Sequence, residues 1–160
     1  MNAVIVMLGM VAVLFALAFF TKRRFGLLGL ALTAGATLSA MWAATLTPYI
    51  RQAGLDLVAP PLQSVVAAGI IVLPAVVLLF SGPMYTKVWQ RVIGSALFAL
   101  LAMALLFESL GSALVLQGEG QTVYALLGQY RTWIITAGIL LALFDLLIVK
   151  APKHVDKEKH

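Results

Sequence analysis

Five apolar stretches, separated by short polar segments, constrain this chain more than any other feature. They cover residues 2–20, 25–50, 65–80, 92–116 and 133–149. A helix needs about 20 consecutive apolar residues to cross the hydrocarbon core of a bilayer. We therefore predict an all-α, polytopic transmembrane helical bundle with five spans. Residues 1–149 would form a single transmembrane domain, followed by a short basic tail over residues 150–160.

The composition excludes several other classes of protein. Hydrophobic residues make up 62% of the 160 residues and charged residues 11%, whereas soluble domains carry about 25% charged residues. The net charge of +5 comes from short basic clusters between apolar stretches, a pattern that does not favour nucleic-acid binding. The absence of cysteine excludes disulfides and thiolate metal sites. The fold must therefore rest on packing within lipid.

The third stretch is the least regular of the five. It is short, and Pro74 interrupts it, which predicts a hinge. A kinked or partly re-entrant segment is one alternative. Another is a four-span protein whose third stretch lies in the membrane interface.

Lysine and arginine predict the orientation of the bundle, because short cytoplasmic loops retain an excess of both. Two of these residues, Arg51 and Arg131, fall on one side of the predicted spans. The other nine fall on the opposite side: Lys22, Arg23, Arg24, Lys87, Arg91, Lys150, Lys153, Lys157 and Lys159. We predict an N-out, C-in chain. Residues 1–20 lack the positive start of a signal peptide, so we expect the first stretch to remain in the protein.

The connection before the last stretch has its own helical pattern. Val123, Leu126, Leu127 and Tyr130 recur at the spacing of one apolar helical face. We expect this segment to lie along the outer leaflet as an amphipathic helix, separate from the span at residues 133–149.

Small residues recur at helical spacing, mainly in the second stretch, and let helices approach closely in lipid. The predicted helix-packing residues are Gly29, Gly35, Ser39, Ala43 and Gly94. The alternative is a polar pathway lined by the threonine and serine hydroxyls of the same stretch.

Glu108 and Asp145 are the two acidic residues inside apolar stretches, where an ionisable group is costly and is a functional candidate by default. Their positions along the predicted spans differ by roughly 12 Å in depth at 1.5 Å per residue, so we do not expect them to pair. Each acid could instead be neutralised by a cation, could serve a proton or cation pathway, or could contact a partner helix. If neutralisation is their only role, substitution by Gln or Asn should leave stability intact.

The cations within reach of each acid differ. Glu108 could meet Arg51 or Arg131 from the outer side. Asp145 could meet Lys150, Lys87 or Arg91 from the inner side.

Motifs for catalysis and cofactor binding do not occur in the sequence. It contains neither His-Glu-x-x-His nor Gly-x-x-x-x-Gly-Lys. His154 and His160 lack a third ligand for a metal. We predict no enzymatic activity, no cofactor and no metal.

Two basic turns and the glycines after them carry a family resemblance. The turn Lys22-Arg23-Arg24-Phe25-Gly26 precedes a stretch with Gly29 and Gly35, and Arg91-Val92-Ile93-Gly94 opens the fourth stretch. In this arrangement residues 1–110 resemble the colicin V production protein family of small bacterial inner-membrane proteins. The chain departs from the family at Asn2, where an acid is frequent, and near Phe98, where a glycine is expected. The family usually has four spans, so residues 133–149 would be an addition.

The resemblance implies a multi-pass protein of the bacterial inner (plasma) membrane, involved in toxin export or envelope homeostasis. Our leading hypothesis is an oligomeric or accessory component whose partners are the lipid bilayer and either further copies of the chain or other membrane proteins. The alternative is an ion channel or proton-coupled transporter that uses an intramembrane carboxylate. Water and polar groups around the acids would favour transport, and sealed or lipid-facing surroundings would favour the accessory role.

Overall fold

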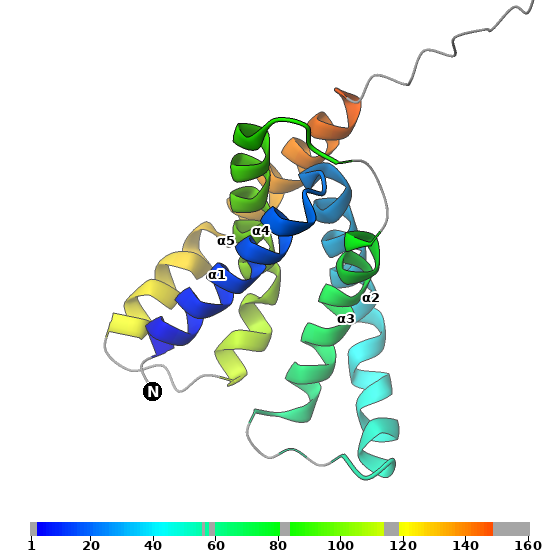
Figure 1. Ribbon diagram of the computed structural model, residues 1–160. Helices are drawn as coiled ribbons and strands as arrows, with labels where there is room; N and C mark the ends of the chain where they lie inside the picture. Colours follow the sequence, from blue (N-terminus) through cyan, green and yellow to red (C-terminus); the bar gives the residue numbers. More distant parts are fainter. Residues whose placement is uncertain (1–2, 56, 58–59, 81–83, 114–118, 149–160) are drawn as a thin grey trace, which may run out of the picture.

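The chain folds into five α-helices that run up and down through a bundle (Figure 1). The structure is a computed structural model that describes residues 3–55, 57, 60–80, 84–113 and 119–148; the side chains of residues 3–7, 108, 110, 112, 113, 119, 120 and 123 lie outside the description. The helices are α1 (Ala3–Thr21), α2 (Phe25–Gln52), α3 (Leu62–Leu79), α4 (Val88–Ala113) and α5 (Glu119–Leu147). Over these ranges the predicted all-α fold is confirmed.

Four of the helices are long and apolar enough to cross a membrane, over Phe25–Gln52, Leu62–Leu79, Val88–Phe107 and Tyr124–Leu147. The apolar part of α1 whose side chains are described, Leu8–Thr21, is shorter, so the fifth span stays a prediction. Large apolar side chains cover the outside of the bundle; Phe80 is 82% exposed and Leu147 is 81% exposed. Exposing such a surface to water costs free energy, whereas contact with lipid tails does not. The chain has the composition and helix lengths of a multi-pass membrane protein.

The third helix is continuous, contrary to the expected interruption. α3 runs without a break from Leu62 to Leu79, with Pro74 inside it. At 1.5 Å per residue its 18 residues span about 27 Å, close to the thickness of the hydrocarbon core. The continuous helix is therefore long enough to cross the core, and the hinge at Pro74 stays a prediction.

The last helix is longer than predicted. α5 begins at Glu119 and runs unbroken for 29 residues, so the expected separation of an amphipathic helix from the final span is wrong. The ring of Tyr124 stacks on Phe107 of α4 with 4.0 Å between the centroids. This contact holds the first turns of α5 against α4, and the helix continues from there into the apolar stretch.

The turn between α1 and α2 is tied to the segment before α4. Lys22 has a φ of 57°, in the left-handed region, which ends α1. The backbone N–H of Tyr85 donates to the Lys22 carbonyl over 2.8 Å, and Arg23 forms an isolated bridge with Met84. Two polar turns that are far apart in the sequence therefore meet at one end of the bundle.

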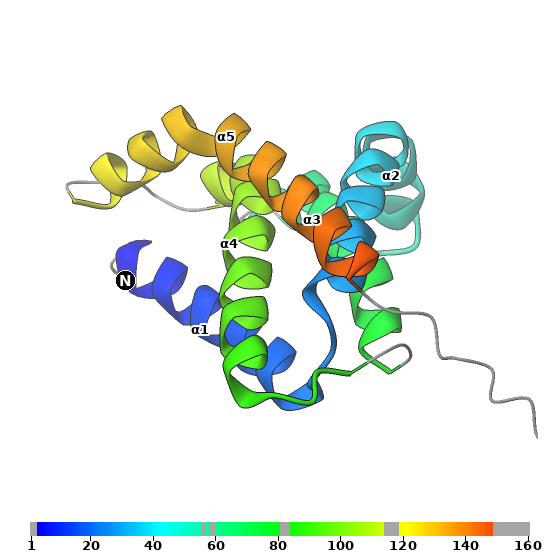
Figure 2. The same cartoon turned by 90° about the horizontal axis from the view of Figure 1, so that it is seen from above.

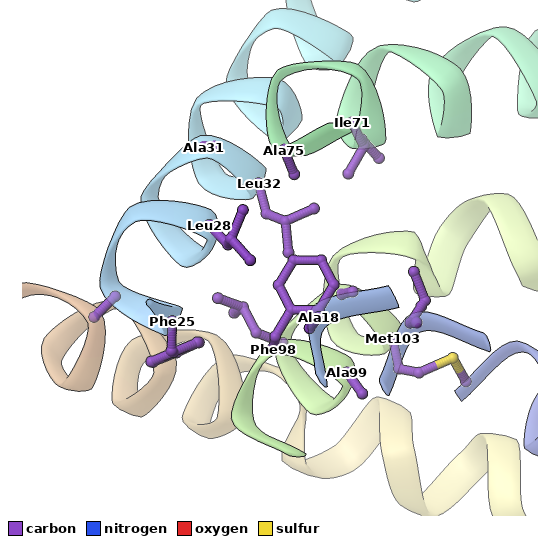
Figure 3. Close-up of a cluster of buried hydrophobic side chains, with 14 of the residues drawn as sticks. Ala18, Phe25, Leu28, Ala31, Leu32, Ile71, Ala75, Phe98, Ala99 and Met103 are labelled. Carbon is purple, nitrogen blue, oxygen red and sulfur yellow. The ribbon is translucent and has the colours of Figure 1, made fainter. Parts of the chain in front are cut away.

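The core lies around α4, which contacts all four other helices. The ring of Phe98 occupies its centre and is 2% exposed, surrounded by Ala18, Leu28, Leu32 and Ala75 from three helices (Figure 3). Viewed from above, α1 lies to one side of α4 and the α2–α3 pair to the other, and α5 crosses from the α1 side to α2 (Figure 2). Phe98 fills the space between α1 and the α2–α3 pair.

Candidate functional site: the Arg24–Asp145 cluster

Asp145 lies in the last turns of α5 and pairs with Arg24, the residue that precedes α2. Arg24 Nη2 lies 3.0 Å from Asp145 Oδ1, and both side chains are about one-sixth exposed. The same nitrogen also donates to the Asp145 backbone carbonyl over 3.3 Å. The guanidinium therefore reaches both the side chain and the backbone of α5.

The second carboxylate oxygen binds the start of α2. Asp145 Oδ2 accepts the backbone N–H of Gly26 over 2.9 Å. The first N–H groups of a helix have no partner within that helix, and a negative charge there is favourable. Asp145 supplies both the acceptor and the negative charge from α5, so it caps the N-terminus of α2 from a different helix.

Gly26 is needed for this contact because the helices meet too closely for a side chain. A Cβ built at Gly26 would lie 2.6 Å from the Ala142 carbonyl oxygen, 2.9 Å from Leu146 Cγ and 3.0 Å from Asp145 Oδ2. The glycine at the start of α2 therefore sets the distance at which Asp145 can dock.

Tyr85 completes the cluster from the segment before α4. Its hydroxyl accepts the N–H of Phe25 over 3.1 Å, and its ring centroid lies 5.3 Å from Arg24 Cζ. Burial raises the pKa of Tyr85 above 10.0, the Phe25 N–H opposes this shift, and the negative charge of Asp145 adds to it. The hydroxyl therefore stays protonated at physiological pH.

Gly94 makes room for Tyr85. A Cβ at this position would lie 2.7 Å from the Tyr85 ring. The predicted packing role of Gly94 thus takes a specific form: the α4 glycine faces the tyrosine of the preceding segment. Ring, guanidinium, carboxylate and two backbone N–H groups form one connected set.

The partner of Asp145 differs from those expected. Lys87 is exposed. Arg91 donates from Nη2 to the Phe19 carbonyl over 2.7 Å, and Lys150 lies outside the described residues. Arg24 was missed because it is 121 residues from Asp145 in the chain. The signal that was available is its position directly before a helix and two residues before a glycine.

Two further arginines at this end bond to helix C-termini. Arg23 Nε donates to the Leu79 carbonyl at the end of α3 over 2.9 Å. Arg91 does the same at the end of α1, and its guanidinium lies 4.4 Å from the Phe19 ring centroid. The last carbonyls of a helix lack partners within it and carry partial negative charge, so these contacts are favourable.

The small residues of α2 face two different neighbours. Gly35, Ser39 and Ala43 are buried. Ser39 Oγ donates to the Ala67 carbonyl of α3 over 3.1 Å. Gly29 faces α5 instead, where a Cβ would lie 3.1 Å from the Ala142 Cβ. The packing residues thus divide α2 into one part that contacts α5 and another that contacts α3.

Glu108 belongs to α4, but its side chain lies outside the described residues. Arg131, one of its two expected partners, donates from Nε to the Ala104 carbonyl over 3.2 Å and has its guanidinium 5.6 Å from the Phe107 ring centroid. Pairing between Glu108 and Arg131 stays a prediction.

Within the described part of the chain, no three His, Cys, Asp or Glu side chains are grouped so as to hold a metal ion. The geometry of the cluster is that of an internal clamp: a carboxylate that accepts from Arg24 and from the Gly26 N–H joins the start of α2 to the end of α5.

Comparisons with known proteins do not extend this description. No family model, no curated protein and no solved structure matches the chain. The resemblance to the colicin V production protein family therefore rests on its sequence motifs alone.

Proposed function

We propose that this protein acts through the contacts of its helices with other membrane components, as an accessory or oligomeric subunit, and that it does not itself move ions. The observation that carries the proposal is the closure of Asp145. Its carboxylate receives Arg24 on one oxygen and the Gly26 N–H on the other. A carboxylate that relays protons must exchange partners with water, whereas this one holds two helices together.

The hydroxyls of α2 support the same proposal. Thr33, Thr37 and Thr47 each donate to a carbonyl of their own helix, over 2.8, 3.0 and 2.6 Å. Ser39 donates across to α3. Hydroxyls that are engaged in this way satisfy the polar demand of a helix in lipid. The row of small residues therefore acts as a packing surface between helices.

The outward surfaces of the bundle offer contacts to lipid or to partner helices. On α5 the exposed side chains include Trp133 at 76%, Phe144 at 66% and Leu140 at 61%. The accessory role would use such faces. A place in the bacterial inner membrane and a task in export or envelope homeostasis follow from the family resemblance and belong to the proposal. The N-out, C-in orientation, which rests on the lysines and arginines, and the absence of enzymatic activity, which rests on the missing motifs, also belong to the proposal.

Ion flux across vesicles tests the proposal against the transport alternative. Purified wild-type protein is reconstituted with controlled orientation, and proton and cation flux is measured across a pH gradient. We expect the flux across vesicles that contain the protein to equal the flux across empty vesicles. Flux that is pH-dependent and lost in Glu108→Gln, with unchanged insertion, would overturn the accessory role.

A second measurement addresses the positive side of the proposal. The mass of the particle extracted together with native lipid is compared with that of one chain. We expect a larger particle, composed either of several copies or of this chain with a second membrane protein. A single chain surrounded only by lipid, together with flux in vesicles, would favour the transporter.

A further inference from the structure

A groove runs along the outside of the bundle between α4 and α5. Beside the Arg24–Asp145 cluster it has a volume of about 250 Å³ and includes Tyr85 and Gln90 in its lining. A second part of about 410 Å³ continues from it toward Trp133. Leu97 and Leu141 line both parts, so the two hollows adjoin along α4 and α5.

The polarity of this groove changes along its length. The polar groups Arg24, Tyr85, Gln90 and Asp145 lie in the part at the charged end. The other part is lined by apolar and aromatic side chains and by Gly138. A groove that is charged at one end and apolar beyond it has the polarity profile of a single lipid leaflet.

Exposed Lys87 extends the polar end of the groove. Gln90, Gly94, Leu97 and Leu101 line the groove from α4 at spacings of three and four residues. Lys87 is three residues before Gln90. Its carbonyl accepts the Arg91 N–H over 3.2 Å, a hydrogen bond of the helical type, so Lys87 takes part in the first turn of α4. By helical spacing Lys87 lies on the same face as Gln90, at the mouth of the groove.

The charge at this end is strongly positive. Among the described residues here, a single carboxylate, Asp145, stands beside several cations: Lys22, Arg23, Arg24, Lys87 and Arg91. Arg24 pairs with Asp145, and the exposed Lys22 and Lys87 add positive charge at the same end. An anionic group is therefore favoured at the mouth of the groove.

The groove is also as long as a leaflet. From Asp145 back to Trp133, α5 covers twelve residues, or about 18 Å at 1.5 Å per residue. Half of the hydrocarbon core measures about 15 Å. An acyl chain that starts at the charged end is therefore long enough to reach Trp133 along α5.

We propose that this groove binds one anionic phospholipid from the leaflet at the Arg24 end, with an acyl chain between α4 and α5 and the headgroup at Lys87 and Gln90. The inference does not depend on the accessory role. A transporter with the same surface would hold the same lipid.

Fluorescence quenching of Trp133 by brominated lipid tests the proposal in membranes. Trp42→Phe and Trp89→Phe leave Trp133 as the only tryptophan, at the far end of the groove. The protein is reconstituted in phosphatidylcholine vesicles that contain a minor share of either brominated phosphatidylglycerol or brominated phosphatidylcholine. We expect phosphatidylglycerol to compete about fivefold better, the contribution of one cation close to an anionic group.

Two variants separate the headgroup from the acyl chain. Lys87→Gln should abolish the preference for phosphatidylglycerol and retain quenching. Ala137→Leu should fill the groove and lower the quenching by both lipids. Thr136→Leu is the control, because this neighbouring residue is exposed and does not line the groove.

Equal competition by the two lipids in the wild type would overturn the proposal, as would a preference that persists in Lys87→Gln. A third contrary result is a dimer whose mass falls to that of a monomer in Ala137→Leu, with no lipid preference. That result would assign the groove to a second copy of the chain. Because Lys87 is exposed, its variant is expected to fold even where the Ala137 variant does not.

Discussion

The Cα of Gly35 in α2 lies directly against the backbone carbonyl of Ile71 in α3. A Cβ at Gly35 would overlap that oxygen and would lie 2.9 Å from the Ile70 oxygen. Pro74 has no N–H, so the carbonyl of Ile70, four residues earlier, cannot receive its usual helical hydrogen bond from residue 74. This close contact between the two helices therefore falls where α3 lacks one of its own hydrogen bonds.

Gly35→Ala should destabilise the protein because its methyl group meets backbone rather than a flexible side chain. We expect the free energy of unfolding to fall by about 1–3 kcal/mol, the usual cost of overpacking. Gly69→Ala is the matched control: it lies in α3 with nothing within 4 Å of a built Cβ, and it should be neutral or stabilising by up to about 1 kcal/mol. Thermal unfolding in detergent measures both. Equal melting temperatures would contradict the close contact.

Asp145→Asn should destabilise the protein, which revises the sequence-based expectation that neutral replacement is tolerated. The substitution leaves the largely buried Arg24 without its charge partner, at a cost of about 2–4 kcal/mol. Arg24→Gln should cost a similar amount. The double variant should cost less than the sum, because one change already breaks the pair. Additive losses in denaturant unfolding would mean that the ion pair contributes nothing, and exposed Lys87→Gln serves as the control.

Stability should fall at alkaline pH through Tyr85. Its folded pKa lies above the ordinary value of 10.0, so its contribution is fully present below pH 10 and is lost as the pH rises through the raised pKa. Tyr85→Phe should lower stability at neutral pH, because the Phe25 N–H loses its acceptor, by about 1 kcal/mol. Above pH 10 the variant should lose less than the wild type. Parallel melting curves across this range would show that Tyr85 ionises freely.

A reporter that is active only in the cytoplasm tests the orientation. Fused after His160, it should be active, because nine of the eleven lysines and arginines fall on that side of the predicted spans. Fusion within the connection between α2 and α3 should give an inactive reporter. The opposite pair of results, in inserted protein, would reverse the orientation.

The apolar stretches predicted the positions of most helices because each stretch ends at a polar residue or proline. The stretch at residues 25–50 became Phe25–Gln52, and that at 65–80 became Leu62–Leu79. The start of α5 was missed because Gln129 and Arg131 look like the edge of a span. In the fold, Arg131 is satisfied by the Ala104 carbonyl and the Phe107 ring of α4. A polar residue that another helix accommodates cannot be told from a boundary by composition.

The candidate site was half predictable for a similar reason. The cost of a charge in hydrocarbon identified Asp145 from sequence. Its partner Arg24 was assigned only to orientation, because nothing local links residues 121 positions apart. Tyr85 gave no signal beyond its place near a membrane surface. Its contact with Phe25 depends on the turn geometry that brings two connections together.

Lysine and arginine have different roles at the charged end of this bundle. Lys22 and Lys87 are exposed, whereas Arg23, Arg24 and Arg91 each bond an oxygen of another helix. Insertion responds to the number of positive charges, which lysine supplies as well as arginine. The flat, forked guanidinium is what reaches carbonyl and carboxylate at once. A chain with lysine in place of these three arginines should therefore insert with the same orientation but fail to hold its helix ends together.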